Sequence, residues 1–148
     1  IFGPGDLNFD RLFPGLFLSI LKNERLKLRS SGKNIRDYLY VEDVVSAYYK
    51  LFLKMIKSKN KNLFVYNIGS KYNFSVKKIC DKILFTLKIN DLKPIVINNS
   101  KIEIFYQKLN FSKAKKELKW NTKTKLDHSI KKSFEWYKSN FNYIKIIN

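Results

Sequence analysis

Apolar residues recur at intervals of three and four over much of the chain, a spacing that predicts amphipathic helices. The first run predicts a helix over about 12–21, with Pro14 tolerated in its first turn. A second helix is expected over about 41–57, because Glu42 and Asp43 fall in its first turn, where the helix dipole favours negative charge. The two apolar stripes are Leu12, Phe13, Leu16, Phe17, Ile20 and Leu21, then Val44, Tyr48, Leu51, Phe52 and Met55.

Three further helices are expected in the second half of the chain. Ser75 is the predicted N-cap of one, and Ser112 of a short one that leads to Trp120. Cys80 lies within an apolar stripe, which favours a small buried thiol over a catalytic one. The stripes are Val76, Ile79, Cys80, Ile83, Leu84 and Leu87; Ala114 and Leu118; and, for the last helix, Leu126, Ile130, Phe134, Tyr137 and Phe141.

Short apolar or alternating runs predict strands between these helices. Residues 26–29 alternate and lead into 31–34, a cluster with the composition of a turn. Residues 63–67 indicate a buried strand after a polar connector, and 94–97 and 102–106 can each form a short strand. Because strands and helices interleave, the fold class is α/β or α+β.

Composition removes several classes of protein. The chain has 148 residues, enough to bury a core, and contains only 5 Gly, 3 Pro, one Cys and one His. Collagen, linker, disulfide scaffold and multi-thiolate zinc site are therefore excluded, and a reducing cytoplasm is the expected compartment. No apolar run approaches the roughly 18 residues of a membrane span. His128 has no acidic or Cys partner at ligand spacing, and we expect it to be exposed.

The charge is strongly basic, with 30 Lys and Arg against 12 Asp and Glu and a formal net charge of +18. Such an excess suggests an anionic partner. Only four of the basic residues are Arg, the residue that recognises phosphates and guanine edges with a bidentate fork, so a solvated Lys-rich surface is the favoured interpretation. A basic nucleic-acid-binding module stays as an alternative, without zinc-finger spacing, an aromatic RNA-binding strand or a basic recognition helix.

One of those four arginines, Arg36, follows the predicted turn and precedes the acidic helix start. A guanidinium there can aim its fork at a diphosphate held over the turn. The alternative is a local surface pair between Arg36 and Asp37, worth less than ~1 kcal/mol.

The string Arg36-Asp37-Tyr38, followed by Tyr40-Val41-x-Asp43, resembles the arginine-aspartate-aromatic segment of the extended short-chain dehydrogenases/reductases, the NAD-dependent nucleotide-sugar epimerases and dehydratases. Four more segments match this family in order, so the resemblance spans residues 1 to about 140. Within it, 5–9 and 28–32 are most similar to the CDP-glucose 4,6-dehydratase branch. The four segments are Gly3-Pro4-Gly5-Asp6; Arg11-Leu12-Phe13-Pro14; Tyr66-Asn67-Ile68-Gly69-Ser70 with Ser75-Val76; and Ser112-Lys113-Ala114 through Leu118 and Trp120 with Trp136-Tyr137.

The resemblance implies an α/β fold: residues 1–148 as the C-terminal, substrate-binding portion of an extended Rossmann-type enzyme, with the last pieces of its sheet. Residues 1–6 and about 38–70 would pack on a missing N-terminal Rossmann half, so the chain would begin in mid-domain. In the complete enzyme NAD oxidises the sugar at C4, and dehydration or epimerisation follows. No Tyr-x-x-x-Lys pair and no G-x-x-G-x-x-G pattern occurs here, so neither NAD binding nor turnover is expected of this chain alone.

The expected function is therefore nucleotide-sugar binding by a truncated product or the second piece of a split gene. A non-catalytic remnant stays open as an alternative. The partners implied are a nucleotide-diphosphate sugar, the Rossmann half and, in the complete enzyme, a second copy; nucleic acid and membrane are not expected.

The resemblance also implies roles for individual residues. Arg36 would clamp the diphosphate, while Arg11 and Leu12 would grip the nucleotide. Leu26 and Leu28 would lie against the base. No catalytic or metal-binding residue is expected. The other substrate contacts would be Gln107 and Asn73, although the family counterpart of Asn73 aligns either there or at Phe74. Trp120 and Trp136 are expected in the core. Where the family has Gly-Trp-x-Pro, this chain has Lys119-Trp120-Asn121-Thr122.

Overall fold

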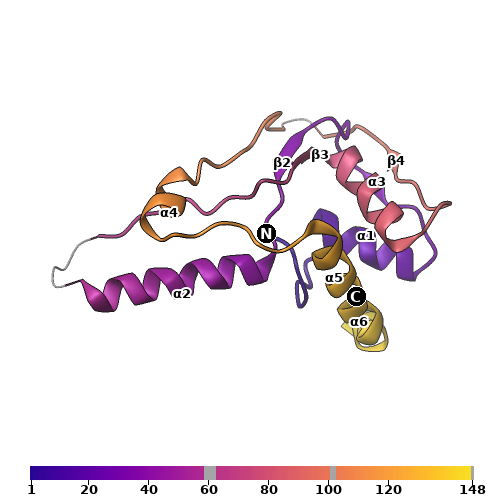
Figure 1. The fold of residues 1–148 in the computed structure, drawn as a ribbon. Helices are drawn as coiled ribbons and strands as arrows, with labels where there is room; N and C mark the ends of the chain where they lie inside the picture. The colour runs from indigo at the N-terminus through magenta and orange to yellow at the C-terminus, as the bar shows by residue number, and fades with distance from the viewer. Residues whose placement is uncertain (59–62, 101–102, 148) are drawn as a thin grey trace.

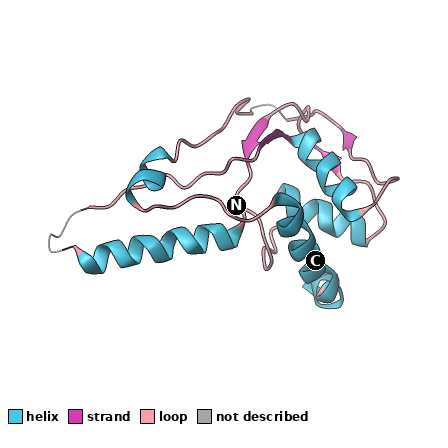
Figure 2. Ribbon diagram, viewed as in Figure 1, coloured by secondary structure: helices cyan, strands magenta, loops and turns pink. Residues whose placement is uncertain are grey.

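The computed structural model describes residues 1–58, 63–100 and 103–147. Helices make up most of the regular structure, and the strands are short (Figures 1 and 2). Among the described helices, none combines the length and apolarity that crossing a bilayer requires. The elements are α1 (Leu12–Leu21), β1 (Lys27–Leu28), β2 (Ile35–Asp37), α2 (Val41–Lys57), β3 (Asn73–Ser75), α3 (Val76–Leu87), β4 (Ile95–Val96), α4 (Ser112–Glu117), α5 (Leu126–Ser139) and α6 (Phe141–Ile147).

Helices α1, α2 and α3 have the predicted extents. The first turn of α2 carries Glu42 and Asp43 and its last turn carries Lys54 and Lys57, so charges of both signs complement the helix dipole. The Ser75 hydroxyl accepts a hydrogen bond from the backbone N–H of Lys78 at 3.2 Å, which confirms the predicted cap of α3.

Two small sheets connect the helices. Strand β1 pairs with β4 in parallel, and β2 pairs with β3 in antiparallel register, which places Arg36 opposite Phe74 and Asp37 opposite Asn73. Phe2 forms a separate parallel bridge to Tyr40. The α/β class is confirmed, with parallel pairing between segments far apart in sequence.

The main core lies between α1, α3, α5 and α6, which gather on one side of the molecule (Figure 1). Phe17 of α1 packs against Phe134 and Tyr137 of α5 with ring centroids 5.6 and 5.2 Å apart. Cys80 is fully buried there, as predicted, and burial raises the pKa of its thiol to about 12. A thiol in that state is inert packing material.

A second, smaller core joins the first turns of α2 to α4 and the loop after it. Trp120 is 1% exposed, as predicted for a core residue, and its indole N–H lies 3.0 Å from the Asp43 carbonyl and 2.9 Å from the Ser46 hydroxyl. The Asp43 carboxylate accepts backbone N–H groups of Lys123 and Thr124. The polar bonds around Trp120 and Asp43 therefore fix the C-terminal loop against α2.

The strand predicted at 63–67 is wrong. This segment is extended but pairs with no strand among the described residues, and Leu63 is 90% exposed. Its burial alternates, with Phe64, Tyr66 and Ile68 turned inward. It has the pattern of a strand without the neighbour that a strand needs.

Four smaller expectations also need correction. Tyr48, Phe52 and Met55 of the predicted α2 stripe are exposed. Phe111, not Ser112, is the N-cap of α4, and the Ser112 N–H is instead bound by the Asn110 side chain. The single last helix divides at Asn140 into α5 and α6. The strand predicted at 102–106 lies partly outside the described residues, and within its described part Tyr106 forms a single bridge to Ile35.

Two other expectations are confirmed. His128 is exposed, and Trp136 packs beside the main core.

Candidate functional site

A cavity of about 520 Å³ opens where the start of α1, strand β1 and strand β2 meet. Four of the six residues that the sequence singled out line it: Arg11, Leu12, Leu28 and Arg36. Two larger hollows, of about 620 and 580 Å³, contain none of the six. The remaining lining residues are Phe9, Asp10, Leu26, Lys27, Arg29, Ser30, Val76, Ile97 and Glu103.

The N-terminal end of α1 supplies one side of the cavity. Arg11 is the N-cap residue in extended conformation, and its guanidinium binds the Asp6 carboxylate at 3.1 Å. The Arg11 side chain is still well exposed, while Leu12 begins the helix proper. A cation tethered at one end but open to solvent can turn toward an anionic ligand at small cost.

Strand β1 supplies an apolar wall. Leu28 is buried, and its carbonyl accepts a hydrogen bond from Ile97 beyond β4 at 2.8 Å, so pairing between β1 and β4 holds this wall in place. Leu26 lies beside it on the cavity. Next in sequence, the Arg29 guanidinium lies 3.8 Å from the Asp10 carboxylate, and both residues line the cavity.

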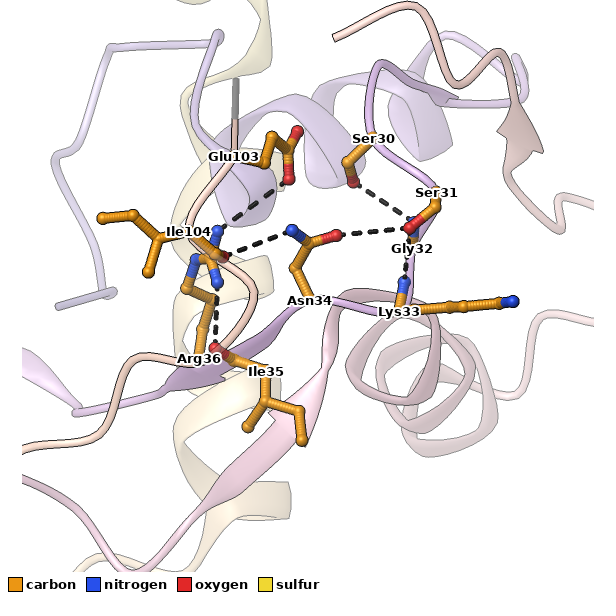
Figure 3. A network of polar contacts seen from close by, with 9 residues as sticks. All are labelled: Ser30, Ser31, Gly32, Lys33, Asn34, Ile35, Arg36, Glu103 and Ile104. Atoms are coloured by element: carbon orange, nitrogen blue, oxygen red, sulfur yellow. Dashed lines mark hydrogen bonds and ion pairs between the residues drawn. The ribbon is translucent and has the colours of Figure 1, made fainter. Parts of the chain in front are cut away.

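Strand β2 carries Arg36 (Figure 3), and the Arg36 side chain is 26% exposed. Its Nη1 donates to the Ile35 carbonyl at 2.9 Å, and its Nη2 faces the Glu103 carboxylate at 3.9 Å. The local surface pair with Asp37 is not formed, because neighbouring residues of a strand point to opposite faces. Arg36 is a half-buried cation that its surroundings hold in the cavity.

Asp37 anchors the opposite face of β2. Its carboxylate accepts N–H bonds from Ser70 at 2.8 Å and Leu109 at 3.3 Å, which join two distant loops to the strand. Burial raises the pKa of Asp37, while the same two backbone N–H groups act to lower it. Asp37 therefore orients β2, and thereby Arg36, without touching the cavity.

The other two predicted residues lie elsewhere. Asn73 faces Asp37 across the β2–β3 ladder and donates to the Ser70 carbonyl at 3.0 Å, on the face away from Arg36. Phe74, its alternative in the alignment, is opposite Arg36 but packs against the main core. Gln107 is exposed, and its backbone N–H bonds to Ile35. Substrate contact by Asn73 or Gln107 stays a prediction.

Sequence reasoning missed Asp10, Arg29 and Glu103. Arg29 had a usable signal, since it is one of only four arginines and is the last residue of a predicted strand. Asp10 and Glu103 had none, because ordinary acidic residues in loops acquire their position only from the long-range packing that closes the cavity. Together, the lining residues combine an apolar wall with several cations, an arrangement suited to an anion linked to a flat or apolar group.

Comparison with known proteins agrees with this geometry. Residues 1–69 match the model of the NAD dependent epimerase/dehydratase family. A trifunctional UDP-glucose 4,6-dehydratase/UDP-4-keto-6-deoxy-D-glucose 3,5-epimerase/UDP-4-keto-L-rhamnose-reductase of Arabidopsis thaliana is 29% identical over 95% of the chain. The dTDP-D-glucose 4,6-dehydratase of Homo sapiens is 30% identical over 85% of it. The chain covers 20% and 36% of these two proteins, respectively.

Solved structures show the same fold. The dTDP-glucose 4,6-dehydratase of Bacillus anthracis, in complex with NAD, superposes with a TM-score of 0.81 over 99% of the chain at 23% identity. A UDP-glucose 4-epimerase of Thermotoga maritima, with UDP-glucose, gives 0.80 over 95% at 23% identity. Each superposition covers 44% of the solved chain. The matched family model, the curated relatives and the common fold show that the chain is similar to the enzymes of the NAD-dependent epimerase/dehydratase family over less than half of their length.

Proposed function

We propose that this chain binds a nucleotide-diphosphate sugar in the cavity around Arg36. One observation carries the proposal: three of the four arginines in a chain of 148 residues, Arg11, Arg29 and Arg36, line the same cavity. Lysine dominates the rest of the basic surface. Guanidinium groups match phosphate oxygens in pairs of parallel hydrogen bonds, so their gathering favours a phosphorylated ligand over a merely solvated surface.

Different walls of the cavity would contact chemically different parts of the ligand. Arg36 has one nitrogen bound to the Ile35 carbonyl, which fixes its direction and leaves its other donors for phosphate oxygens. Leu26 and Leu28 offer an apolar surface to the base. Arg11 and Arg29 are exposed enough to close on the diphosphate from the rim.

The names of the relatives support this substrate class, since they describe enzymes of UDP-glucose and dTDP-glucose. The finer placement beside CDP-glucose 4,6-dehydratases stays a prediction. Dehydration or epimerisation would be the activity of a complete enzyme, with NAD held by residues outside this chain, because its five glycines never form a dinucleotide pattern. The chain alone would bind ligand without turning it over.

We further propose that α2 and residues 63–68 dock onto a Rossmann-type half. Helix α2 has a second apolar face besides the one buried on Trp120, formed by exposed Val45, Tyr48, Tyr49, Phe52 and Ile56. A helix apolar on two faces is normally covered on both.

Residues 63–68 also favour docking, because their burial alternates as in an edge strand. The solved chain of the similar dehydratase is longer than the match, which covers 44% of it. Docking can be tested by co-expression with the N-terminal part of a relative: the two should co-purify, and Phe52→Asp should abolish this, whereas no complex would contradict docking.

Isothermal titration tests the binding proposal. UDP-, dTDP-, CDP- and GDP-glucose would be titrated into the wild-type chain, Arg36→Ala and the control Arg25→Ala. Arg25 lies outside the cavity, where it bonds to the Lys93 carbonyl. Loss of a charge-assisted contact should weaken the preferred ligand about tenfold or more in Arg36→Ala, with little change in Arg25→Ala. Binding that survives Arg36→Ala unchanged would contradict the proposal.

The two alternative functions predict different results when nucleotide sugars or DNA are titrated into the same variants. A non-catalytic remnant would bind none of the four sugars. A nucleic-acid-binding module would bind arbitrary DNA with steep salt dependence and would be equally sensitive to either arginine substitution.

A further inference from the structure

The nearest acidic group to Arg36 belongs to Glu103, on the connection between β4 and α4. The Arg36 Nη2 and Glu103 Oε2 atoms are 3.9 Å apart, and the two side chains are similarly shielded, at 26% and 27% exposure. Both residues line the cavity, and Figure 3 shows their charged groups pointing toward each other. The proposed phosphate site therefore contains a carboxylate beside its central cation.

The backbone around Glu103 is tied to the strand that carries Arg36. The side-chain amide of Asn34, itself buried, donates to the Ile104 carbonyl at 3.2 Å, and Ile35 N–H donates to the Phe105 carbonyl at 2.9 Å. These bonds lie within two residues of Glu103, as Figure 3 shows for the Asn34 contact. These bonds hold the backbone next to Glu103 against the strand that carries Arg36, so moving Glu103 away from the site would require breaking them.

The charges that line the cavity indicate which kind of diphosphate it favours. Four cations and two carboxylates, Asp10 and Glu103, line the cavity, so the lining residues carry a net charge of +2; Asp6, outside the lining, pairs with Arg11. A diphosphate esterified at both ends carries one negative charge on each phosphate and balances this sum. A free nucleoside diphosphate carries a further charge on its terminal phosphate, whose last proton dissociates with a pKa of about 6. The four cations are Arg11, Lys27, Arg29 and Arg36.

We propose that Glu103 is a specificity-determining residue that favours a doubly esterified diphosphate over a free nucleoside diphosphate. The inference rests on the proposed function and concerns the same cavity. A terminal phosphate placed on Arg36 brings its additional charge within reach of the Glu103 carboxylate, and like charges at such distances repel appreciably in a partly shielded site. A sugar ester at that position removes the additional charge and most of the repulsion.

Paired titrations test the role of Glu103. UDP and UDP-glucose, or the corresponding pair for the base that binds best, would be titrated with EDTA present at about pH 8, where the terminal phosphate is fully ionised. Glu103→Gln should tighten binding of the free diphosphate about fivefold or more and that of the sugar diphosphate less than about twofold. Glu103→Asp, which keeps the charge, should keep the preference. Glu24→Gln is the matched control, since it removes the same charge from an exposed residue outside the cavity.

The outcomes separate this inference from the proposed function. If Glu103→Gln leaves the ratio of the two affinities unchanged while Arg36→Ala still weakens the sugar diphosphate, the role of Glu103 is refuted and the binding proposal stands. If neither ligand binds, or neither depends on Arg36, both fail. A ratio that changes equally in Glu24→Gln would also refute the inference, because the effect would then be one of net charge.

Discussion

The two cores of this chain differ in how fully their helices are covered by other parts of the chain. Helices α1, α3, α5 and α6 enclose side chains such as Phe17 on every side, whereas α2 buries one face on Trp120 and leaves Phe52 on the other face 56% exposed. The candidate cavity adjoins the enclosed core. The contrast separates a well-enclosed region, which holds the proposed ligand site, from a surface that on our proposal binds a partner.

The sharpest test of this contrast compares the same residue type in both regions. Phe17→Ala should lower the free energy of unfolding by about 3–5 kcal/mol, because it opens a cavity among packed rings. Phe52→Ala should change it by no more than about 0.5 kcal/mol in the isolated chain. Chemical denaturation of the two variants measures both values. Equal losses would show that α2 is already covered on both faces.

Trp120→Phe tests how firmly α2 is attached through its inner face. The substitution keeps an aromatic ring but removes the N–H that bonds to the buried Asp43 carbonyl and to the Ser46 hydroxyl, so the Asp43 carbonyl loses one of its donors. We expect a loss of about 1–3 kcal/mol by thermal or chemical unfolding. Hydrogen exchange should rise in α2 and less in α1. A uniform rise in both helices would contradict a division into two regions.

Lys119→Gly should stabilise the smaller core. Lys119 has a φ of 49°, in the left-handed region that glycine adopts without steric cost. Glycine at this position should raise the free energy of unfolding by about 0.5–1 kcal/mol. A thermal melt that is unchanged or lower would mean that the Lys119 side chain contributes more than its backbone strain costs.

Helices α3 and α5 of the enclosed core are joined by an ion pair whose contribution to stability depends on pH. Asp127 of α5 binds Lys82 at 2.7 Å and Thr86 at 3.2 Å, both on α3, and the Lys82 contact lowers the pKa of Asp127 below its ordinary value of 3.8. A lowered carboxyl pKa contributes stability above the unfolded value that is lost as the pH falls through the folded value. Because Asp127 is largely exposed, Asp127→Asn should cost less than about 1 kcal/mol at pH 7 and nothing below the folded pKa. A constant effect at every pH would contradict the ion-pair account.

Sequence patterns predicted those elements whose stabilising contacts are local. The apolar stripe and the acidic first turn predicted the observed limits of α2, and Ser75 identified the start of α3. The segment 63–67 was misjudged because an apolar run does not say whether a neighbouring strand exists within the chain. A strand prediction presupposes a partner in a way that a helix prediction does not.

The residues of the candidate site also differ in whether the sequence could identify them. Arg36 could be singled out from its place after a predicted turn, whereas the candidate role of Leu28 came from the family resemblance. Asn73 lies outside the cavity because the β2–β3 register places it opposite Asp37, and that register depends on pairing that sequence spacing does not reveal. Glu103 was missed because it meets Arg36 from 67 positions away, through contacts that exist only in the folded chain.

The central claim is that Arg36 receives the phosphates of a sugar nucleotide, and the arginine content allows a direct measurement. A ¹H–¹⁵N spectrum of the Nε groups contains one signal for each of the four arginines. During titration with UDP-glucose or the best-binding analogue, the Arg36 signal should shift most and saturate with the binding isotherm, while that of Arg25 stays in place. A titration that saturates with the Arg36 signal unmoved would place the ligand elsewhere and contradict the account.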